Sequence, residues 1–173
     1  FDWWLAGEAD AQTRQLVEHA NSLITPAARL DLGADGIGAP WWADTGSKAH
    51  LRWVHPAPED ELMAALARVH AAGGLTVGEG SRFAGSFRSD GLLVPVFDLD
   101  RDSHPDEWVA GTVELAKRLA EALADDSELT AAQRAWLDAV ARERVATARE
   151  AQQRFKESGD PADRRAALAT EFV

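Results

Sequence analysis

The chain has 173 residues and carries 18 Lys and Arg against 29 Asp and Glu, which gives a formal net charge of −11 at pH 7. Hydrophobic residues make up 46% of the chain and charged residues 27%, a composition typical of a folded domain and not of a disordered or membrane-embedded protein. The sequence contains no cysteine, which excludes disulfides, thiol nucleophiles and cysteine-ligated metal centres. The acidic charge is spread along the chain and disfavours direct binding of nucleic acid by this fragment, because phosphate backbones are polyanions.

Two further features describe the cellular context. The only methionine is Met63, so Phe1 is not an initiator residue, and we expect the sequence to begin inside a longer protein. No stretch approaches the roughly 18 to 20 apolar residues of a membrane-spanning helix, and no leader pattern precedes the first predicted helix. We therefore expect a cytoplasmic protein without membrane contact, whose partner is another protein or the upstream part of the same chain.

The first third of the chain combines one helix with short strands. After an aromatic opening at 1–5, apolar residues recur at spacings of three and four and predict a helix that ends before Pro26. A strand is expected at 29–32, and a clearer one at 49–54. In the second strand, Leu51 and Trp53 share the face expected in the core, and the alternate residues share the other face.

The middle of the chain predicts a helix over 58–73, because a proline at its first position is followed by acidic residues. A strand at 75–77 is expected to lead into a glycine- and serine-rich connection over 78–91. The next strand is expected at 92–97. Pro95 cannot donate a backbone hydrogen bond, so this strand is predicted to lie at a sheet edge or to contain a bulge there.

Two capping-box patterns predict two helices in the last third of the chain. The first helix is expected to end near residue 124 and the second near residue 156, with a short helix over 161–170 after them. The two patterns are Ser103 with Asp106 and Thr130 with Gln133.

One regularity suggests the architecture. A strand, His55-Pro56, an acidic turn and a helix recur 49 residues later at His104-Pro105. The sequence therefore predicts an α+β domain over 1–126, with a four-stranded, mainly antiparallel sheet built from two ββα units and helices on one face. A helical extension over 127–173 would pack on this domain or project from it. Coincidence between two ordinary helix starts is the alternative explanation for the recurrence.

The least ordinary stretch is the locally positive segment 78–88. Its glycines allow close approach of backbone N–H groups, its serines add hydroxyls, and its arginines are fork-shaped donors that match phosphate or carboxylate. It lacks the spacing of a P-loop or a dinucleotide-binding motif. The other interpretation is a β-connection whose phenylalanines pack inward. The candidate ligand-binding residues, two of them from the predicted strand 49–54, are Gly80, Ser81, Arg82, Ser86, Arg88, His50 and Arg52.

Other patterns give no site. Asp98, Asp100 and Asp102 alternate like oxygen ligands of a cation, but Ser103 and Val109 replace the Gly and Glu of a calcium loop. An acidic turn before a helix explains these residues better, and the histidines lack the spacing of a zinc motif. We expect no metal and no cofactor, and the catalytic residues, if any, are unknown.

Seven tryptophans and no tyrosine are present. The pairs Trp3-Trp4 and Trp41-Trp42 lie at terminal or loop positions, where both rings of a pair cannot point into one core. Exposed, they would contact a peptide, a sugar or a partner protein. We favour the other interpretation, in which they are buried and anchor the N-terminus and the 33–48 loop.

The chain resembles an actinobacterial family of unknown function, whose members are often labelled preprotein-translocase-like. The segments Trp41-Trp42, 49–54 and 78–99 carry the resemblance, which extends from Phe1 to Arg149. It implies a longer protein with a basic N-terminal tail and a further domain, and it implies no catalytic residue. The chain continues from Glu150 to Val173, beyond the usual end of the family.

The leading hypothesis is a non-enzymatic binding or accessory domain that engages a protein or an anionic ligand through segment 78–88 and the His50/Arg52 face. One alternative is a nucleic-acid-associated protein that binds through an absent basic tail. The other is an enzyme acting on a phosphorylated or carboxylated small molecule. In that enzyme Arg82 and Arg88 would hold the anion, His50 or Glu79 would be the general acid–base, and Asp98 and Asp100 would hold a divalent ion.

Overall fold

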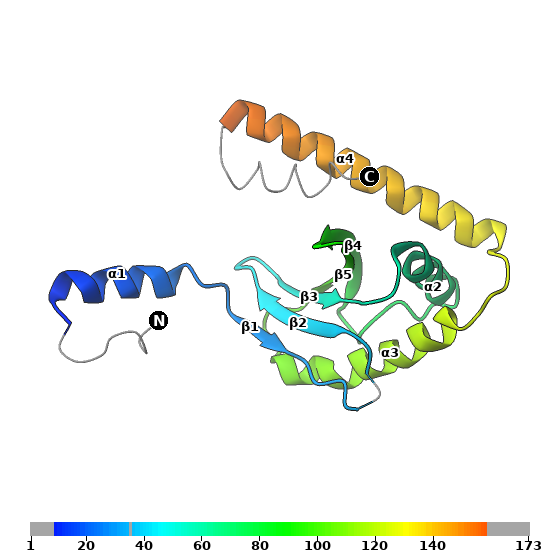
Figure 1. The fold of residues 1–173 in the computed structure, drawn as a ribbon, viewed down its shortest axis with the longest axis horizontal. Coiled ribbons are helices and arrows are strands. Elements are labelled where there is room, and N and C mark those ends of the chain that lie inside the picture. The colour runs from blue at the N-terminus through cyan, green and yellow to red at the C-terminus, as the bar shows by residue number, and fades with distance from the viewer. Residues whose placement is uncertain (1–8, 35, 159–173) are drawn as a thin grey trace.

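The computed structural model describes residues 9–34 and 36–158 and has an α+β fold (Figure 1). Within these residues, four α-helices and five strands are joined by connections, and a short 3-10 helix precedes α3. In chain order the elements are α1 (Ala11–Ser22), β1 (Ala27–Arg29), β2 (Ala39–Asp44), β3 (Ala49–Val54), α2 (Glu59–Ala71), β4 (Arg82–Ser89), β5 (Leu92–Leu99), η2 (Pro105–Trp108), α3 (Val109–Leu123) and α4 (Ala131–Ser158).

The strands form one antiparallel sheet in the order β1-β2-β3-β5-β4. The predicted antiparallel arrangement is confirmed, but the sheet has five strands and not four. The expected strand at 75–77 is wrong, and the expected connection over 78–91 contains β4. Asp90 and Gly91 have φ angles of 51° and 81°, and they form a two-residue hairpin between β4 and β5. Because this turn reverses the direction of the chain, residues 82–89 pair with β5 and form strand β4.

Two ββα units build the centre of the molecule. The order β2-β3-α2 recurs as β4-β5-α3, and the inner strands of the two units, β3 and β5, pair antiparallel. The recurrence expected around His55-Pro56 and His104-Pro105 therefore corresponds to a repeated arrangement of elements. β1 adds a fifth strand beside β2.

The core lies between one face of the sheet and helices α2 and α3. Alternate residues of β3 and β5 point into it, and the predicted burial of Leu51 and Trp53 is confirmed at 0% and 1% exposure. Apolar residues spaced three and four apart on the helices complete it. Its fully covered members include Ala49, Leu93, Phe97, Leu62, Leu66, Leu115 and Leu119.

The expectations for Pro95 are wrong. β5 lies between β3 and β4, so it is not an edge strand. The register irregularity lies on β4, between Phe83 and Gly85, and not at Pro95. The β3–β5 pairing runs from Ala49 with Leu99 to Arg52 with Val96, so Pro95 follows the end of this ladder, where a missing N–H costs little.

The two predicted helix starts differ in outcome. The box of Thr130 with Gln133 is confirmed, because each side chain hydrogen-bonds the backbone N–H of the other residue. The box of Ser103 with Asp106 is wrong by one residue. His104 caps the helix start, and the Glu107 side chain accepts from the His104 N–H at 2.6 Å.

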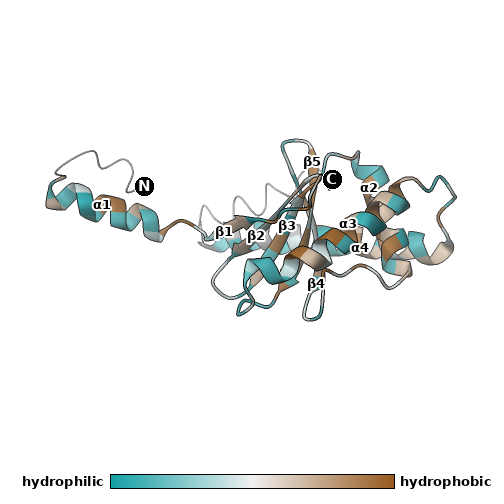
Figure 2. Ribbon diagram, turned by 90° about the horizontal axis from the view of Figure 1, so that it is seen from below, coloured by the Kyte–Doolittle hydropathy of each residue, from teal (hydrophilic) through white to brown (hydrophobic). Residues whose placement is uncertain are grey.

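The first and last helices differ in how they contact the sheet domain. α1 has no buried residue, and Figures 1 and 2 show it standing apart from the other elements. α4 is anchored by its first half, where Trp136 stacks on His70 with ring centroids 4.8 Å apart and Val140 is buried. The predictions for 1–5 and 161–170 lie outside the described residues.

Candidate functional site

The face of the sheet turned away from the core, called the outer face below, carries the candidate site. Residues directly opposite each other in antiparallel strands share a face, so the strand register defines rows across it. In the described chain, the residues of these rows lie outside the contiguous hydrophobic core cluster, although Ala43 is buried. The first row is Ala27, Ala43, His50, Asp98 and Arg82, and the second row is Arg29, Trp41, Arg52, Val96 and Gly85.

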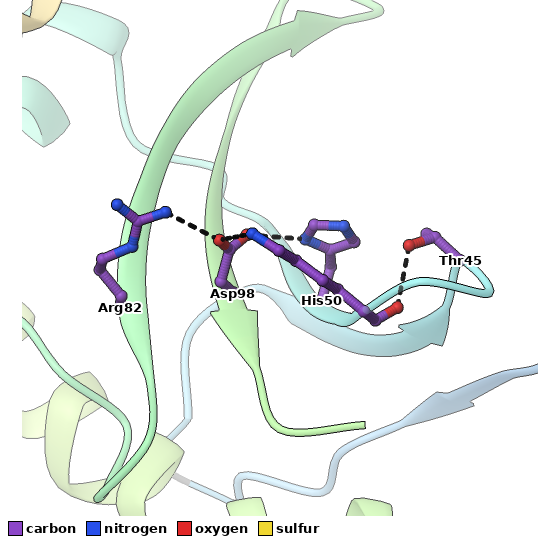
Figure 3. Close-up of polar contacts among 5 residues, drawn as sticks. Thr45, His50, Arg82 and Asp98 are labelled. Carbon is purple, nitrogen blue, oxygen red and sulfur yellow. Dashed lines mark hydrogen bonds and ion pairs between the residues drawn. The ribbon is translucent and has the colours of Figure 1, made fainter. Parts of the chain in front are cut away.

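The first row is organised by one carboxylate, Asp98, whose side chain is 15% exposed. Figure 3 shows basic side chains converging on it from three elements. Lys48 Nζ, from the turn before β3, donates to Asp98 Oδ2 at 2.7 Å, and Arg82 Nη2 of β4 donates to the same oxygen at 3.0 Å. His50 Nδ1 of β3 lies 3.3 Å from Oδ1, without hydrogen-bond geometry.

These contacts fix the charge of the first row. Burial opposes ionisation of Asp98, but the hydrogen bonds from Lys48 and Arg82 and the charge of Lys48 outweigh it and lower the pKa of the carboxyl. Burial is also the main cause that lowers the pKa of His50, and Asp98 acts in the opposite direction. His50 is therefore neutral at pH 7, and the cluster consists of two cations and one anion.

The second row carries an exposed indole between two arginines. Trp41 is 41% exposed, so its expected burial is wrong, whereas its neighbour Trp42 is half-buried against the core. The alternation of β2 sends the two rings to opposite faces. Arg29 and Arg52 are both exposed, and neither guanidinium has a hydrogen bond or ion pair with any residue that the structure describes.

The outer face therefore differs in charge from the rest of the chain. Across the two rows and the adjoining turn, four cationic side chains face one carboxylate, in a chain with a net charge of −11. The cations are Arg29, Lys48, Arg52 and Arg82. A face with this excess of positive charge attracts anionic groups, because the nearest charges dominate the local electrostatic field while distant charges are screened.

The predicted site over 78–88 is divided by the structure. At its start Ser81 closes a turn: its hydroxyl donates to the carbonyl of Gly78 at 2.7 Å and accepts from the N–H of Val77 at 3.0 Å. Gly80 lies in the same turn. The hydroxyl predicted to bind a ligand is therefore engaged in the fold.

A β-bulge separates the two arginines of this segment. Asp98 pairs with Arg82, but after the bulge the register shifts by one residue, so Arg88 pairs with Leu93 and turns to the core side. There the Nε of Arg88 donates to Glu59 at the start of α2, and Arg144 of α4 lies 3.4 Å from the same carboxylate.

Ser86 also faces the core side, with its hydroxyl 4.0 Å from the sulfur of Met63. Of the seven predicted ligand-binding residues, the structure brings together Arg82, His50 and Arg52 on the outer face. The enzyme hypothesis requires Arg82, Arg88, His50 and Asp98 to converge, and they lie on two faces of the sheet.

The acidic turn after β5 has a local structural role. Asp100 accepts a hydrogen bond from the N–H of Asp102 at 3.0 Å, as expected for a turn that precedes a helix. No group of three or more His, Cys, Asp or Glu that could hold a metal ion occurs within 9–34 and 36–158. None of the described helices is both long and apolar enough to cross a membrane.

Sequence reasoning missed two residues of the outer face, Arg29 and Lys48, and it placed Trp41 in the interior although this side chain is 41% exposed. Arg29 ends β1, a strand of three residues, which is too short for a periodic signal. The Asp90-Gly91 dipeptide is a strong hairpin signal, and it would have identified β4. A regular register from this turn would place Arg82 opposite Leu99, and the bulge between Phe83 and Gly85 brings Arg82 opposite Asp98 instead.

Comparison with known proteins gives a family but no activity. The model of a family of unknown function, DUF5926, matches residues 1–149. No curated protein and no solved structure matches the chain. Both rows of the outer face lie inside the matched span.

Proposed function

We propose that this chain, which belongs to the DUF5926 family of unknown function, is a non-enzymatic accessory domain that binds a partner protein through the outer face. The observation that carries the proposal is the charge of that face, which has four cationic side chains and one carboxylate in a molecule with a net charge of −11. Complementary potentials steer association and select partners, so the partner presents an anionic group here.

The second row supports a protein as the partner. Arginine and tryptophan are enriched where protein interfaces gain most of their binding free energy, whereas lysine and the acidic residues are depleted there. Trp41, Arg29 and Arg52, whose guanidiniums have no ion pair within the described residues, place these residue types side by side on three adjacent strands. The partner is a separate cytoplasmic protein or the upstream part of a longer chain.

The remaining functional expectations stay predictions. We expect no direct binding of nucleic acid by this fragment, because its net charge of −11 repels polyanions. The actinobacterial origin and the preprotein-translocase label carry no weight in the proposal. Catalysis is not proposed, since the four residues that the enzyme hypothesis requires lie on two faces of the sheet.

Affinity capture from the cytosol of the source organism tests the proposal. The bait is the full-length protein, compared with a variant carrying Arg29→Glu and Arg52→Glu and with a control carrying Arg142→Glu on α4. Arg142 is exposed, so the control changes the charge without altering the outer face. We expect one stoichiometric protein that the wild type and the control retain and the double variant loses. Equal recovery by all three baits would contradict the proposal.

A further inference from the structure

We propose that the row Arg29–Trp41–Arg52, called the Arg–Trp–Arg row below, binds an acidic segment of a protein. The arginines bind carboxylates of that segment, and the indole contacts an apolar side chain between them. This inference rests on the proposed function of the outer face and names the chemistry of its partner.

The geometry of the row is set by strand register. Arg29 lies opposite Trp41, and Trp41 lies opposite Arg52, on strands β1, β2 and β3. Neighbouring strands are about 4.8 Å apart, so the backbones of the two arginines are about 10 Å apart with the indole midway. Each guanidinium is a planar fork that matches the two oxygens of a carboxylate.

The first row shows how this face holds a carboxylate. Asp98 of β5 accepts hydrogen bonds from Lys48 and Arg82, so the chain itself supplies the anion between these cations. Two residues along β5, on the same face, Val96 occupies the equivalent place beside Arg52. The Arg–Trp–Arg row therefore has the cations of such a cluster without its carboxylate, and a partner would supply the missing group.

The exposed indole adds an apolar contact. Trp41 is one of the few large hydrophobic side chains that are exposed in the described residues, with 41% of its surface accessible. An indole flanked by cations suits an acidic segment with an apolar or aromatic residue better than it suits a bare anion. Truncation of such a central tryptophan costs more than truncation of the groups around it.

A single-stranded nucleic acid is the competing occupant, because bases stack on indoles and phosphates bind arginines. The charge of the whole chain argues against it. Successive phosphates would extend beyond the Arg–Trp–Arg row onto a protein with a net charge of −11, whereas an acidic segment needs only two carboxylates at the row itself.

The test measures binding of defined probes to the intact chain. A labelled peptide of alternating glutamate and leucine is titrated against the wild type, and a matched peptide of glutamine and leucine and a thymidine oligonucleotide serve as comparisons. We expect the glutamate peptide to bind more tightly than both. Arg29→Ala and Arg52→Ala should each weaken it about fivefold, and Trp41→Ala about thirtyfold.

Two controls keep the result interpretable. Arg142→Ala on α4 removes the same charge from another exposed site and should leave the affinity unchanged. The arginine variants change exposed residues without described partners, so they test the row even if Trp41→Ala fails to fold.

Three results would overturn the inference: no binding of the glutamate peptide, binding that ignores the Arg29→Ala and Arg52→Ala changes, or tighter binding of the oligonucleotide. If the peptide fails while the charge-reversed bait still loses its captured protein, only this inference is wrong. If that bait keeps its partner, the proposed function is wrong as well.

Discussion

A single carboxylate, Asp98, influences the titration of its neighbour His50 on the outer face. Its negative charge raises the pKa of His50, although burial keeps that pKa below the ordinary value. Asp98→Asn should therefore lower the pKa of His50 further, which an NMR titration of the imidazole measures. The free energy of unfolding should change by less than about 1 kcal/mol, because ion pairs to exposed cations contribute little.

The control for this experiment is Asp100→Asn, which changes an exposed carboxylate in the turn after β5 and should leave His50 unaffected. If the pKa of His50 rises or stays constant in the Asp98→Asn variant, the Asp98 charge does not raise the pKa of His50 in the wild type.

His55 gives the protein a pH-dependent stability. It is 2% exposed, burial lowers its pKa, and its Nδ1 accepts a hydrogen bond from the N–H of Ala57, which requires the neutral ring. Above about pH 6.5 the ring is neutral in both folded and unfolded chains. As the pH falls below that value, His55 becomes protonated in the unfolded chain before it does in the folded chain. The free energy of unfolding therefore decreases.

Urea unfolding at neutral and mildly acidic pH measures this loss. His55→Gln removes the contribution, so its stability should fall less than that of the wild type, by up to about 1.4 kcal/mol for each pH unit. The matched control is His19→Gln on α1, at an exposed position. An identical fall in His55→Gln and wild type would contradict the assignment.

At the residue scale, the bulge marks the limit of prediction from the sequence. Arg82 and Arg88 are six positions apart and would share a face in a regular strand. The register shift between Phe83 and Gly85 sends them to opposite faces, toward Asp98 and toward Glu59. The two-residue alternation of side chains along a strand does not reveal the position of a β-bulge. The candidate site was therefore only partly predictable from the sequence.

Among the elements, α3 is held close to the loop before β4 by Gly111. A Cβ atom at this position would lie 1.8 Å from the carbonyl oxygen of Val77. Helix propensity alone predicts that Gly111→Ala stabilises the protein by about 1 kcal/mol. The structure predicts the opposite. The free energy of unfolding should fall by about 1 to 3 kcal/mol, because the backbone of the loop has to move to make room for the Cβ atom.

Chemical denaturation of Gly111→Ala decides between these signs. Its neighbour Ala110 is exposed on the same helix, so Ala110→Gly should cost only the propensity difference of about 1 kcal/mol. A more stable Gly111→Ala variant would show that α3 does not pack on Val77 in this way.

Elements with a strong local signal were predictable. Leu51 and Trp53 alternate, and Thr130 with Gln133 caps α4, so β3 and the start of α4 follow from short-range chemistry. β1 has three residues and is held by pairing with β2, which no local pattern encodes. The outer face depends on that pairing, and this is why Arg29 was missed.

For the whole molecule, the net charge of −11 predicts that nucleic acid does not bind directly, but it gives no indication of a positive face. Charge counted along the chain averages over both faces of every strand. Only the pairing of β1, β2, β3, β5 and β4 shows that Arg29, Arg52 and Arg82 lie on one side. The fold class was accessible from the sequence, and the location of the face was not.

The end of the family match at residue 149 predicts where the stable unit ends. The described anchors of α4, Trp136, Val140 and Arg144, precede that position. A chain truncated after Arg149 should therefore keep its melting temperature. A decrease of more than about 4 °C, which exceeds about 1 kcal/mol for a chain of this size, would mean that later residues support the fold.

A chain truncated after residue 126 is the comparison. It loses the ring contacts of Trp136 with His70 and Phe83, and it should unfold at a lower temperature. The division of the chain at residue 126 into a sheet domain and a helical extension stays a prediction until this pair of truncations is measured.

A partner that binds as proposed covers the outer face of the sheet. Hydroxyl-radical footprinting of the captured complex measures this directly, because Trp41 is 41% exposed and oxidises readily when free. We predict that the partner protects Trp41 and leaves Leu16 on α1, which is 64% exposed, as reactive as before. Unchanged oxidation of Trp41 in a stoichiometric complex would contradict the account.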